Sequence, residues 1–182
     1  MSRSHSDIPD HLRIRFLRRW KCRLMWPLAT SSERQGCFRI AYRGGTFSFH
    51  STTFPGPCVQ CVYLRCLPAN DGDLLSIANF RHCEAIDLGG TDISDCGIQY
   101  LAGMERLQYL FLWHTRISDA SIAFINRIRQ LRMLSVYNTS ITERGVDTLN
   151  RSLPNCLLCL GDDCYRFGDF RDGEALRLFL AS

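Results

Sequence analysis

Two cysteine clusters are the part of this chain whose spacing comes nearest to a chemical site. They share the pattern C-x-x-C-x-x-x-x-C and comprise Cys58, Cys61 and Cys66, and Cys156, Cys159 and Cys164. Paired C-x-x-C motifs can build a tetrahedral zinc site. The internal repeat described below, however, places the clusters at opposite ends of a stack, about three strand spacings of roughly 4.8 Å apart. They cannot share one ion, and each would need a fourth ligand, such as His50 or His82 for the first. We therefore expect core thiols and assign no metal ligand and no cofactor.

A histidine and a carboxylate are the second arrangement that could do chemistry. His114 lies in an aromatic stretch and Asp87 stands one repeat earlier, so the two could form an acid–base pair. A lone histidine on a binding face more often bonds to a partner or to water, and no nucleophile elbow, phosphate loop or metalloprotease helix accompanies it. We expect no catalytic residue and no enzymatic activity.

The composition is that of one folded domain. The 182 residues are 46% hydrophobic and 22% charged, and the formal charge of +4 is unevenly spread. A basic stretch without acids contains Arg13, Arg15, Arg18, Arg19, Lys21 and Arg23. The remaining chain is close to neutral, so charge gives no indication of nucleic-acid binding. The longest uncharged run near this stretch is too short for a transmembrane helix.

Ten cysteines would indicate a disulfide framework only in a short secreted protein. Cys83 and Cys159 occupy repeat positions that are filled elsewhere by Leu, Ile or Val, which favours small buried thiols. We expect reduced cysteines and a cytoplasmic protein. The alternative is export, since basic residues followed by the apolar residues 24–29 weakly resemble a secretory signal.

An internal repeat of 24 residues organises the chain. Its apolar positions are Cys83, Ile86, Leu88, Ile93, Ile98 and Leu101, then Leu107, Leu110, Leu112, Ile117, Ile122 and Ile125, then Leu131, Leu134, Val136, Ile141, Val146 and Leu149. A fixed period of this length is typical of solenoids, in which stacking supplies the core that one unit cannot form alone. The frame extends back to Val59 as a weaker first repeat and forward to a degraded strand at 156–160.

The segments that flank the repeats are predicted to differ from them. Residues 1–36 form a basic N-terminal extension whose apolar spacing predicts a short amphipathic helix, either a cap on the stack or an attachment to a membrane or partner. Residues 37–58 are predicted to be a hairpin and linker, with strands at 37–42 and 46–50 around a Gly-Gly turn. The repeats fill 59–164, and residues 165–182 are expected to cap the far end.

The spacing inside each repeat carries a family resemblance. Leu107, Leu110 and Leu112 fit L-x-x-L-x-L-x-x-(N/C)-x-L, which Thr115 and Ile117 complete. The chain resembles leucine-rich repeat proteins, and its recurring (L/I)-(S/T)-D-x-G-(L/I) segment is similar to the cysteine-containing subtype of bacterial proteins, including those of planctomycetes. The resemblance covers residues 59 to about 160. It implies an α/β solenoid with short parallel strands on the concave side and helices on the convex side, used as a binding scaffold.

Polar positions of the repeat have predicted structural roles. A Ser or Thr followed by an acid is placed to begin a helix, as at Ser118 and Asp119, because the hydroxyl accepts from free N–H groups and the acid favours the positive helix end. The hydroxyls of Thr91, Thr115 and Thr139 are expected to bond to turn backbone inside the stack.

The outward strand positions should align into one concave sheet, which is the usual binding face of a solenoid. The residues predicted to bind a partner there are Tyr63, Arg65, Asp87, Tyr109, Phe111, Trp113, His114 and Tyr137. Tyr, Trp and Arg are over-represented at interface hot spots. We expect an exposed aromatic patch on a non-catalytic scaffold that binds a protein or peptide. The alternative is that the N-terminal hairpin, the C-terminal tail or a second copy of the chain covers these rings.

Two further functions stay open from the N-terminal residues. Residues 8–16 weakly resemble the opening of an F-box, which precedes leucine-rich repeats in substrate adaptors of ubiquitin ligases, although the other helices of that module are not evident. Residues 11–26 could instead contact an anionic membrane surface in a salt-dependent way.

Overall fold

The computed structural model describes residues 30–50 and 58–161 as alternating strands and helices. In chain order these are α2 (Ser31–Tyr42), β1 (Thr46–His50), β2 (Cys58–Tyr63), α3 (Asp71–Ile77), β3 (Ala85–Asp87), α4 (Asp95–Leu101), β4 (Tyr109–Phe111), the 3₁₀ turn η3 (Asp119–Ser121), α5 (Ile122–Ile125), β5 (Met133–Ser135), α6 (Glu143–Ser152) and β6 (Leu157–Cys159). The predicted amphipathic helix, the F-box-like stretch, the proline-containing linker and the C-terminal cap lie outside the described residues. Among the described helices, none combines the length and hydropathy that crossing a bilayer requires.

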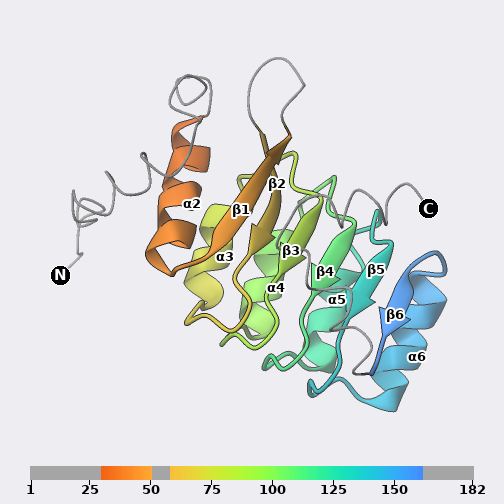
Figure 1. Ribbon diagram of the computed structural model, residues 1–182. Helices are drawn as coiled ribbons and strands as arrows, with labels where there is room; N and C mark the ends of the chain where they lie inside the picture. The colour runs from red at the N-terminus through yellow and green to blue at the C-terminus, as the bar shows by residue number, and fades with distance from the viewer. Residues whose placement is uncertain (1–29, 51–57, 162–182) are drawn as a thin grey trace.

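The strands of the described residues form one sheet in chain order, from β1 to β6. β1 is antiparallel to β2, and every later pair is parallel. Each step between neighbouring repeats is 24 residues, so Ile86 lies opposite Leu110, which lies opposite Leu134. The helices stack beside one another along one face of this sheet (Figure 1). The register confirms the predicted repeat and the solenoid of parallel strands and helices.

Side chains of each short strand alternate between the two faces of the sheet. Leu110 and Leu112 are fully buried in the core between the sheet and the helices. Phe111, between them, belongs to a separate apolar cluster on the opposite face. The predicted inward and outward positions of the strand are therefore confirmed.

The turns after the strands also repeat. A left-handed backbone conformation recurs at Cys66, Gly90, His114 and Asn138, with φ angles of 55°, 67°, 52° and 50°. The next residue is a buried threonine in two repeats: Thr91 donates to the carbonyl oxygen of Leu88 at 2.6 Å, and Thr115 donates to that of Leu112 at 2.5 Å. Thr139 makes the equivalent bond. The predicted role of these hydroxyls is confirmed.

The predicted helix starts are confirmed as well. The N-caps of α4, η3 and α6 are Ser94, Ser118 and Thr142. Each hydroxyl accepts a hydrogen bond from a backbone N–H in the first turn, which satisfies one of the donors that a helix start leaves free.

The strand predicted at residues 37–42 is wrong, because these residues are the second half of α2. The helix begins at a capping box in which Thr30 and Glu33 each accept from the other's backbone N–H. Cys37 and Ile40, three residues apart, are both buried on one helix face. The strand at 46–50 is present as β1, but its hairpin partner is β2, which follows it along the chain.

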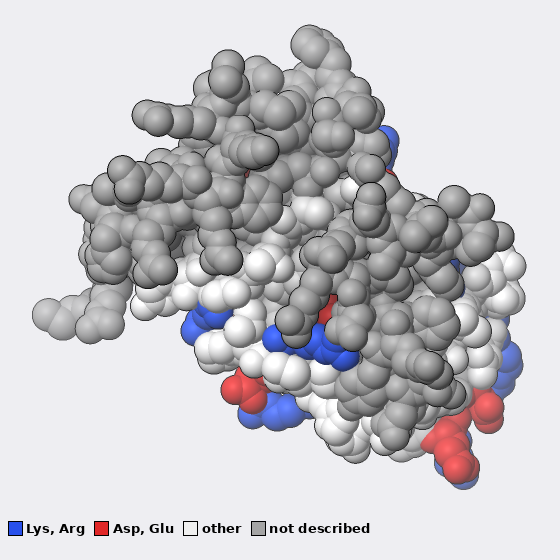
Figure 2. All heavy atoms as spheres, in the orientation of Figure 1, with Lys and Arg blue, Asp and Glu red and all other residues white. Residues whose placement is uncertain are grey.

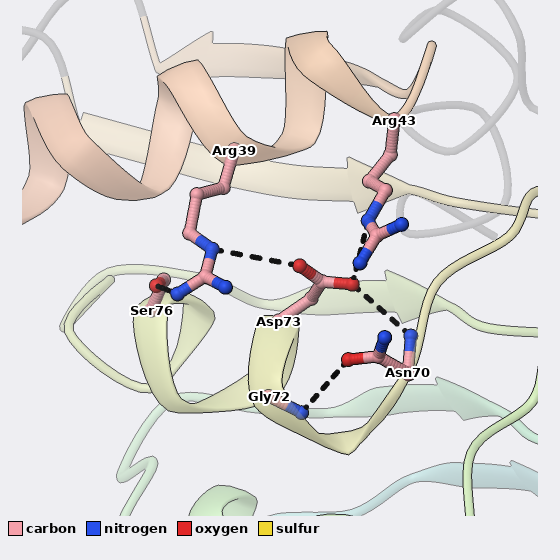
Figure 3. A network of polar contacts seen from close by, with 6 residues as sticks. All are labelled: Arg39, Arg43, Asn70, Gly72, Asp73 and Ser76. Atoms are coloured by element: carbon pink, nitrogen blue, oxygen red, sulfur yellow. Dashed lines mark hydrogen bonds and ion pairs between the residues drawn. The ribbon is translucent and has the colours of Figure 1, made fainter. Parts of the chain in front are cut away.

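A buried carboxylate holds α2 on the first repeat (Figure 3). Asp73 Oδ1 lies 3.5 Å from Nε of Arg39, and Oδ2 lies 3.0 Å from Nε of Arg43. Oδ2 also accepts from the backbone N–H of Asn70 at 3.0 Å, within the capping box that begins α3. Only 4% of the Asp73 side chain is exposed, so α2 is bound to the stack by charge-assisted contacts around a desolvated group.

Candidate binding face

The structure brings the predicted binding residues together on the face of the sheet opposite α2 to α6, here called the strand face. Tyr63, Asp87 and Phe111 are direct cross-strand neighbours in one row, which continues to Ser135. Tyr109 lies in the parallel row that starts at Cys61 and Ala85. The 24-residue period therefore converts three separate stretches of sequence into adjacent positions of one surface.

An apolar set on this face is named here the aromatic cluster. Its members are Cys61, Ala85, Tyr109, Phe111, Trp113, Met133 and Cys159, with Tyr63 and Tyr137 packed against it. Phe111 lies between the smaller side chains of Asp87 and Ser135, whereas Tyr109 lies between Ala85 and the long side chain of Met133.

The expectation of an exposed aromatic patch is wrong for its three central rings, whereas Tyr63 and Tyr137 are half-buried and His114 is exposed. Tyr109, Phe111 and Trp113 expose only 4%, 3% and 5% of their surface. The fractions refer to a single copy of the chain, so a second copy is not required to bury them. The described strand of the predicted hairpin does not overlie them, because β1 lies in the plane of the sheet beside β2.

The indole ring of Trp113 packs at a position that is not evident from the sequence. A Cβ atom at Gly89 would overlap the indole ring, so the absence of a side chain there lets the ring lie across the end of β3. The guanidinium carbon of Arg65 lies 4.8 Å from the ring centroid, in cation–π geometry. Arg65, Gly89 and Trp113 occupy the same position of successive repeats. A glycine in that column, between an arginine and a tryptophan, was the available signal.

His114 extends this contact toward the fourth repeat. Its ring meets Trp113 edge-on at 5.6 Å and Tyr137 edge-on at 5.7 Å between centroids. Its Nδ1 lies 2.6 Å from the amide nitrogen of Asn138. Arg65, Trp113, His114 and Tyr137 therefore form a continuous row, called the rim row below, along the carboxyl ends of the strands.

Asp87 is the buried charge of the strand face, with 3% of its surface exposed. Burial raises the pKa of its carboxyl from 3.8 to about 6, against the opposing effects of the Gly89 backbone N–H and the Arg65 charge. The Gly89 N–H donates to Oδ1 at 3.0 Å. Burial also raises the pKa of the neighbouring Tyr63 hydroxyl. These groups can orient a bound polar atom, and neither is a nucleophile.

Ser135 is a second polar group on this face. Its side chain is fully buried, and within the described part of the chain its hydroxyl oxygen has no hydrogen-bond partner. A buried hydroxyl without a partner destabilises a structure by about 1–3 kcal/mol. The strand face therefore holds a polar atom whose hydrogen bonding a bound group could complete.

No disulfide bond involves Cys61, Cys66, Cys83, Cys96 or Cys156 of the described residues, and the burial of the cysteines follows the repeat. Cys83 is fully buried in the core, while Cys61 and Cys159 lie in the aromatic cluster on β2 and β6. Burial raises the pKa of the Cys61 and Cys83 thiols and raises that of Cys156 to about 11, which keeps them protonated. In the described part of the chain, no three His, Cys, Asp or Glu side chains are grouped as metal ligands.

A separate groove lies at the C-terminal end of the stack, where a following repeat would pack. Its volume is about 470 Å³. Apolar side chains of the last repeat line it, among them Val136, Ile141, Val146 and Leu160, and Glu143 and Asp147 stand at its edge. This end groove adjoins the strand face, because Tyr137 and Asn138 also line it, whereas Val136 belongs to the core on the helix side of the sheet.

Comparisons with known proteins give structural similarity only. No family model matches the chain, and no curated protein matches it. Internalin C2 of Listeria monocytogenes aligns with 46% of this chain at 24% identity and a TM-score of 0.39, and the aligned part spans about a third of that protein, 34%. The leucine-rich repeat ectodomain of the receptor kinase SOBIR1 of Arabidopsis thaliana aligns with 71% of this chain and 91% of its own, at 15% identity and a TM-score of 0.43.

A third solved structure is the leucine-rich repeat ectodomain of the Arabidopsis thaliana receptor kinase GASSHO1/SCHENGEN3, in complex with CASPARIAN STRIP INTEGRITY FACTOR 2. It aligns with 72% of this chain and 16% of its own length, at 14% identity and a TM-score of 0.44. The fold itself is established by the geometry above, namely a 24-residue register, short parallel strands on one side and capped helices on the other. The described repeats of the chain form a leucine-rich repeat solenoid.

Proposed function

We propose that this protein is a non-catalytic binding module that takes a protein or peptide segment on its strand face. The observation that carries the proposal is the aromatic cluster bordered by the rim row. Trp, Tyr and Arg dominate binding energy at interfaces because they bury a large area at a small cost in side-chain entropy. Stacked strands of a solenoid present such residues over an extended surface.

The dimensions and charge of the strand face favour a polypeptide. The cluster reaches from β2 to β6, four strand spacings or about 19 Å, which is the length of an extended segment of about six residues. Arg65 is the cation of the rim row, and on the described surface visible in Figure 2 basic and acidic side chains stand in small mixed groups. Nucleic acid is bound mainly through phosphate contacts from clustered basic residues, which this face does not offer.

The burial of the rings sets a condition on binding. Because Phe111 and Tyr109 are buried, the half-buried and exposed residues of the rim row, such as Arg65 and His114, make the first contact with a partner. The Ser135 hydroxyl gives such a partner an advantage, because a backbone carbonyl or N–H placed over it would satisfy a group that now lacks a partner.

A peptide-display selection on the purified full-length protein tests this function. Peptides of about twelve residues are selected and their dissociation constants measured for Arg65→Ala and Tyr137→Ala, which alter the rim row but leave the fully buried rings in place. We expect each change to weaken binding at least tenfold. Arg116→Ala is the matched control, because Arg116 pairs with Asp92 on an exposed turn, and should change binding less than twofold. Failure to select any peptide, or peptides insensitive to both rim changes, would contradict the proposal.

A further inference from the structure

We infer that the polypeptide segment bound by this protein is acidic, and that a row of exposed arginines beside the strand face recognises its carboxylates. This row, called the arginine edge below, consists of Arg106, Arg127, Arg129, Arg132 and Arg151. The inference rests on the proposed function for the polypeptide nature of the partner. The preference for acidic residues is a separate claim with its own test.

The repeat brings the five arginines together. They lie in or next to the turns that lead from α4, α5 and α6 to β4, β5 and β6, so they stand at the edge of the sheet where these strands begin (Figure 1). The Ser152 hydroxyl donates to Oδ1 of Asn126 at 2.7 Å, which sets Arg151 beside Arg127. In the sequence the five residues are spread from 106 to 151, so the total charge of the chain does not reveal the cluster.

The fold does not balance the charge of the arginine edge. Its five side chains are exposed, and none of them takes part in an ion pair within the described residues. The same turns contain one acid, Glu105. The negative end of a helix favours a basic side chain, but α4 and α5 have no basic residue in their last turns, and only Arg151 lies in such a position. Since like charges on adjacent turns repel one another, an acidic partner would stabilise this edge.

The opposite edge, where the strands end, has a different charge distribution. There Arg65 lies over the ring of Trp113, and Arg116 pairs with Asp92. The first turns of the helical segments at this edge contain acids, namely Asp95, Asp119 and Glu143. Charge is therefore divided between the two edges that border the strand face. A segment lying across the strands would be attracted through acids on one of its sides.

The arginine edge is continuous with the strand face. Arg132 directly precedes Met133, a member of the aromatic cluster, and its carbonyl oxygen accepts from the N–H of Leu157 at 2.7 Å. The side chain of Leu157 is 56% exposed. The chain advances five residues, or about 17 Å, from Arg132 to Tyr137 of the rim row. An extended segment between them directs alternate side chains to the two sides, so one set can reach the rim row and the other the arginine edge.

The pattern of charge favours carboxylates at selected positions over a uniform row of phosphates. Glu105 lies between Arg81 and Arg129 at the same position of successive repeats. A nucleic acid or an anionic membrane would bring negative groups against Glu105, whereas a polypeptide can place a neutral residue there. An arginine binds a carboxylate through two parallel hydrogen bonds. The partner that fits is therefore a segment rich in Asp or Glu.

Charge reversal in the full-length protein tests this preference. The probes are three labelled peptides of about twelve residues, identical except at four positions that hold Glu, Gln or Lys. At low ionic strength we expect the Glu peptide to bind at least about fivefold more tightly than the Gln peptide, since each exposed ion pair adds a small contribution. Arg127→Glu with Arg129→Glu should make the Lys peptide bind more tightly than the Glu peptide. A Glu peptide that binds no better than the Gln peptide, or an order unchanged by the reversal, would overturn the inference.

The matched control is Arg116→Glu with Arg144→Glu, which changes the net charge equally at two exposed arginines of the opposite edge. It should leave the order of the three peptides unchanged. If it reversed the order as well, net charge alone would explain the preference and the arginine edge would have no role. Should Arg127→Glu with Arg129→Glu fail to fold by circular dichroism, Arg127→Gln with Arg129→Gln replaces it and should abolish the difference between the Glu and Gln peptides.

Single-stranded oligouridylate and phosphatidylserine vesicles are the competing probes. At an equal concentration of charge, neither should displace the Glu peptide from the wild-type protein. Displacement by one of them that disappears in the charge-reversed variant would overturn the inference in favour of that anion.

Tyr137→Ala separates the inference from the proposed function. If the strand face binds the segment, this change should weaken the binding of all three peptides and leave their order unchanged. An order that follows the charge of the arginine edge, with no effect of Tyr137→Ala, would support the inference and count against binding on the strand face. An effect of Tyr137→Ala without any preference for the Glu peptide would overturn the inference and leave the proposed function standing.

Discussion

Asp95 and Ser118 join two successive repeats through both oxygens of one carboxylate. Asp95 Oδ1 accepts from the backbone N–H of Ser118 and Oδ2 accepts from its hydroxyl, each at 2.7 Å. The Ser118 hydroxyl accepts in turn from the backbone N–H of Ala120, at the start of η3. The same two bonds recur from Asp71 to Ser94 and from Asp119 to Thr142. The residue that begins one helix therefore fixes the start of the next.

The carboxylate contacts from Asp71, Asp95 and Asp119 to the next repeat are called the ladder below. Removing one of these carboxylates should lower the free energy of unfolding. Asp95→Ala leaves the N–H and hydroxyl of Ser118 without their acceptor, and we expect a loss of about 1–3 kcal/mol in the free energy of unfolding. Urea denaturation followed by circular dichroism measures it. Glu143→Ala is the matched control, because Glu143 is exposed in the same column of the last described repeat, and should change stability by less than about 0.5 kcal/mol. Equal effects of the two substitutions would show that the ladder contributes little.

Gly97 and Gly145, which lie against the ladder acids Asp71 and Asp119 of the preceding repeats, should be equally constrained. A Cβ atom at Gly97 would collide with Oδ1 of Asp71 from the preceding repeat. Gly97→Ala should therefore displace that carboxylate and destabilise the protein by about 1–3 kcal/mol, although alanine is the better helix former. Gly103→Ala, where a Cβ atom would meet nothing within 4 Å, is the control. A stabilised Gly97→Ala variant would mean that the carboxylate moves away without cost.

The sequence predicts the features that recur with the period and misses those that depend on neighbours in space. The register, the Ser and Thr caps and the threonine hydroxyls follow from residues that reappear every 24 positions. The acids beside the caps were assigned to helix ends, and their reach to the next repeat was missed because the partner lies 23 residues away. α2 was missed since a single amphipathic turn, Cys37 to Ile40, resembles a β-prone run.

On the strand face, too, the period predicts some features, and others depend on neighbours in space. The period alone places Tyr109, Phe111 and Trp113 on one surface, and the register confirms this. Their burial was not predictable from the period, because it depends on neighbours in space such as Gly89, whose lack of a side chain makes room for the Trp113 ring. Exposure is a property of the whole chain, whereas the direction of a strand side chain is local.

The buried carboxylate under α2 leads to a third prediction. Asp73→Ala removes the shared partner of Arg39 and Arg43 together with the acceptor of the Asn70 N–H. Breaking a buried charged contact is strongly destabilising, and we expect a loss of about 2–4 kcal/mol. Hydrogen exchange should rise in residues 31–42 before it rises in the repeats. Arg116→Ala, which breaks a largely exposed ion pair with Asp92, should lower the free energy of unfolding by less than about 1 kcal/mol. Uniform exchange in Asp73→Ala would show that α2 and the repeats unfold together.

The buried Asp87 carboxyl predicts how stability depends on pH. Its pKa is about 6 in the folded protein against 3.8 for an unperturbed carboxyl, so the folded state binds the proton more tightly than the unfolded state. The free energy of unfolding should therefore fall as pH rises from about 4 to about 6. Asp87→Asn keeps an acceptor for the Gly89 N–H and removes the ionisation. The free energy of unfolding of Asp87→Asn should equal that of the wild type below about pH 4 and exceed it by up to about 3 kcal/mol above pH 6.

Urea denaturation at intervals between pH 4 and pH 7 measures this difference. Asp92→Asn, at a carboxylate that is 72% exposed, is the control and should run parallel to the wild type. A constant offset between Asp87→Asn and the wild type across the range would indicate a packing effect without a titration. A less stable Asp87→Asn at pH 7 would show that the ionised carboxylate, paired with Arg65, is favourable on this face. In that case the strand face would be a site that recognises charge, and selected peptides would carry a cation opposite Asp87.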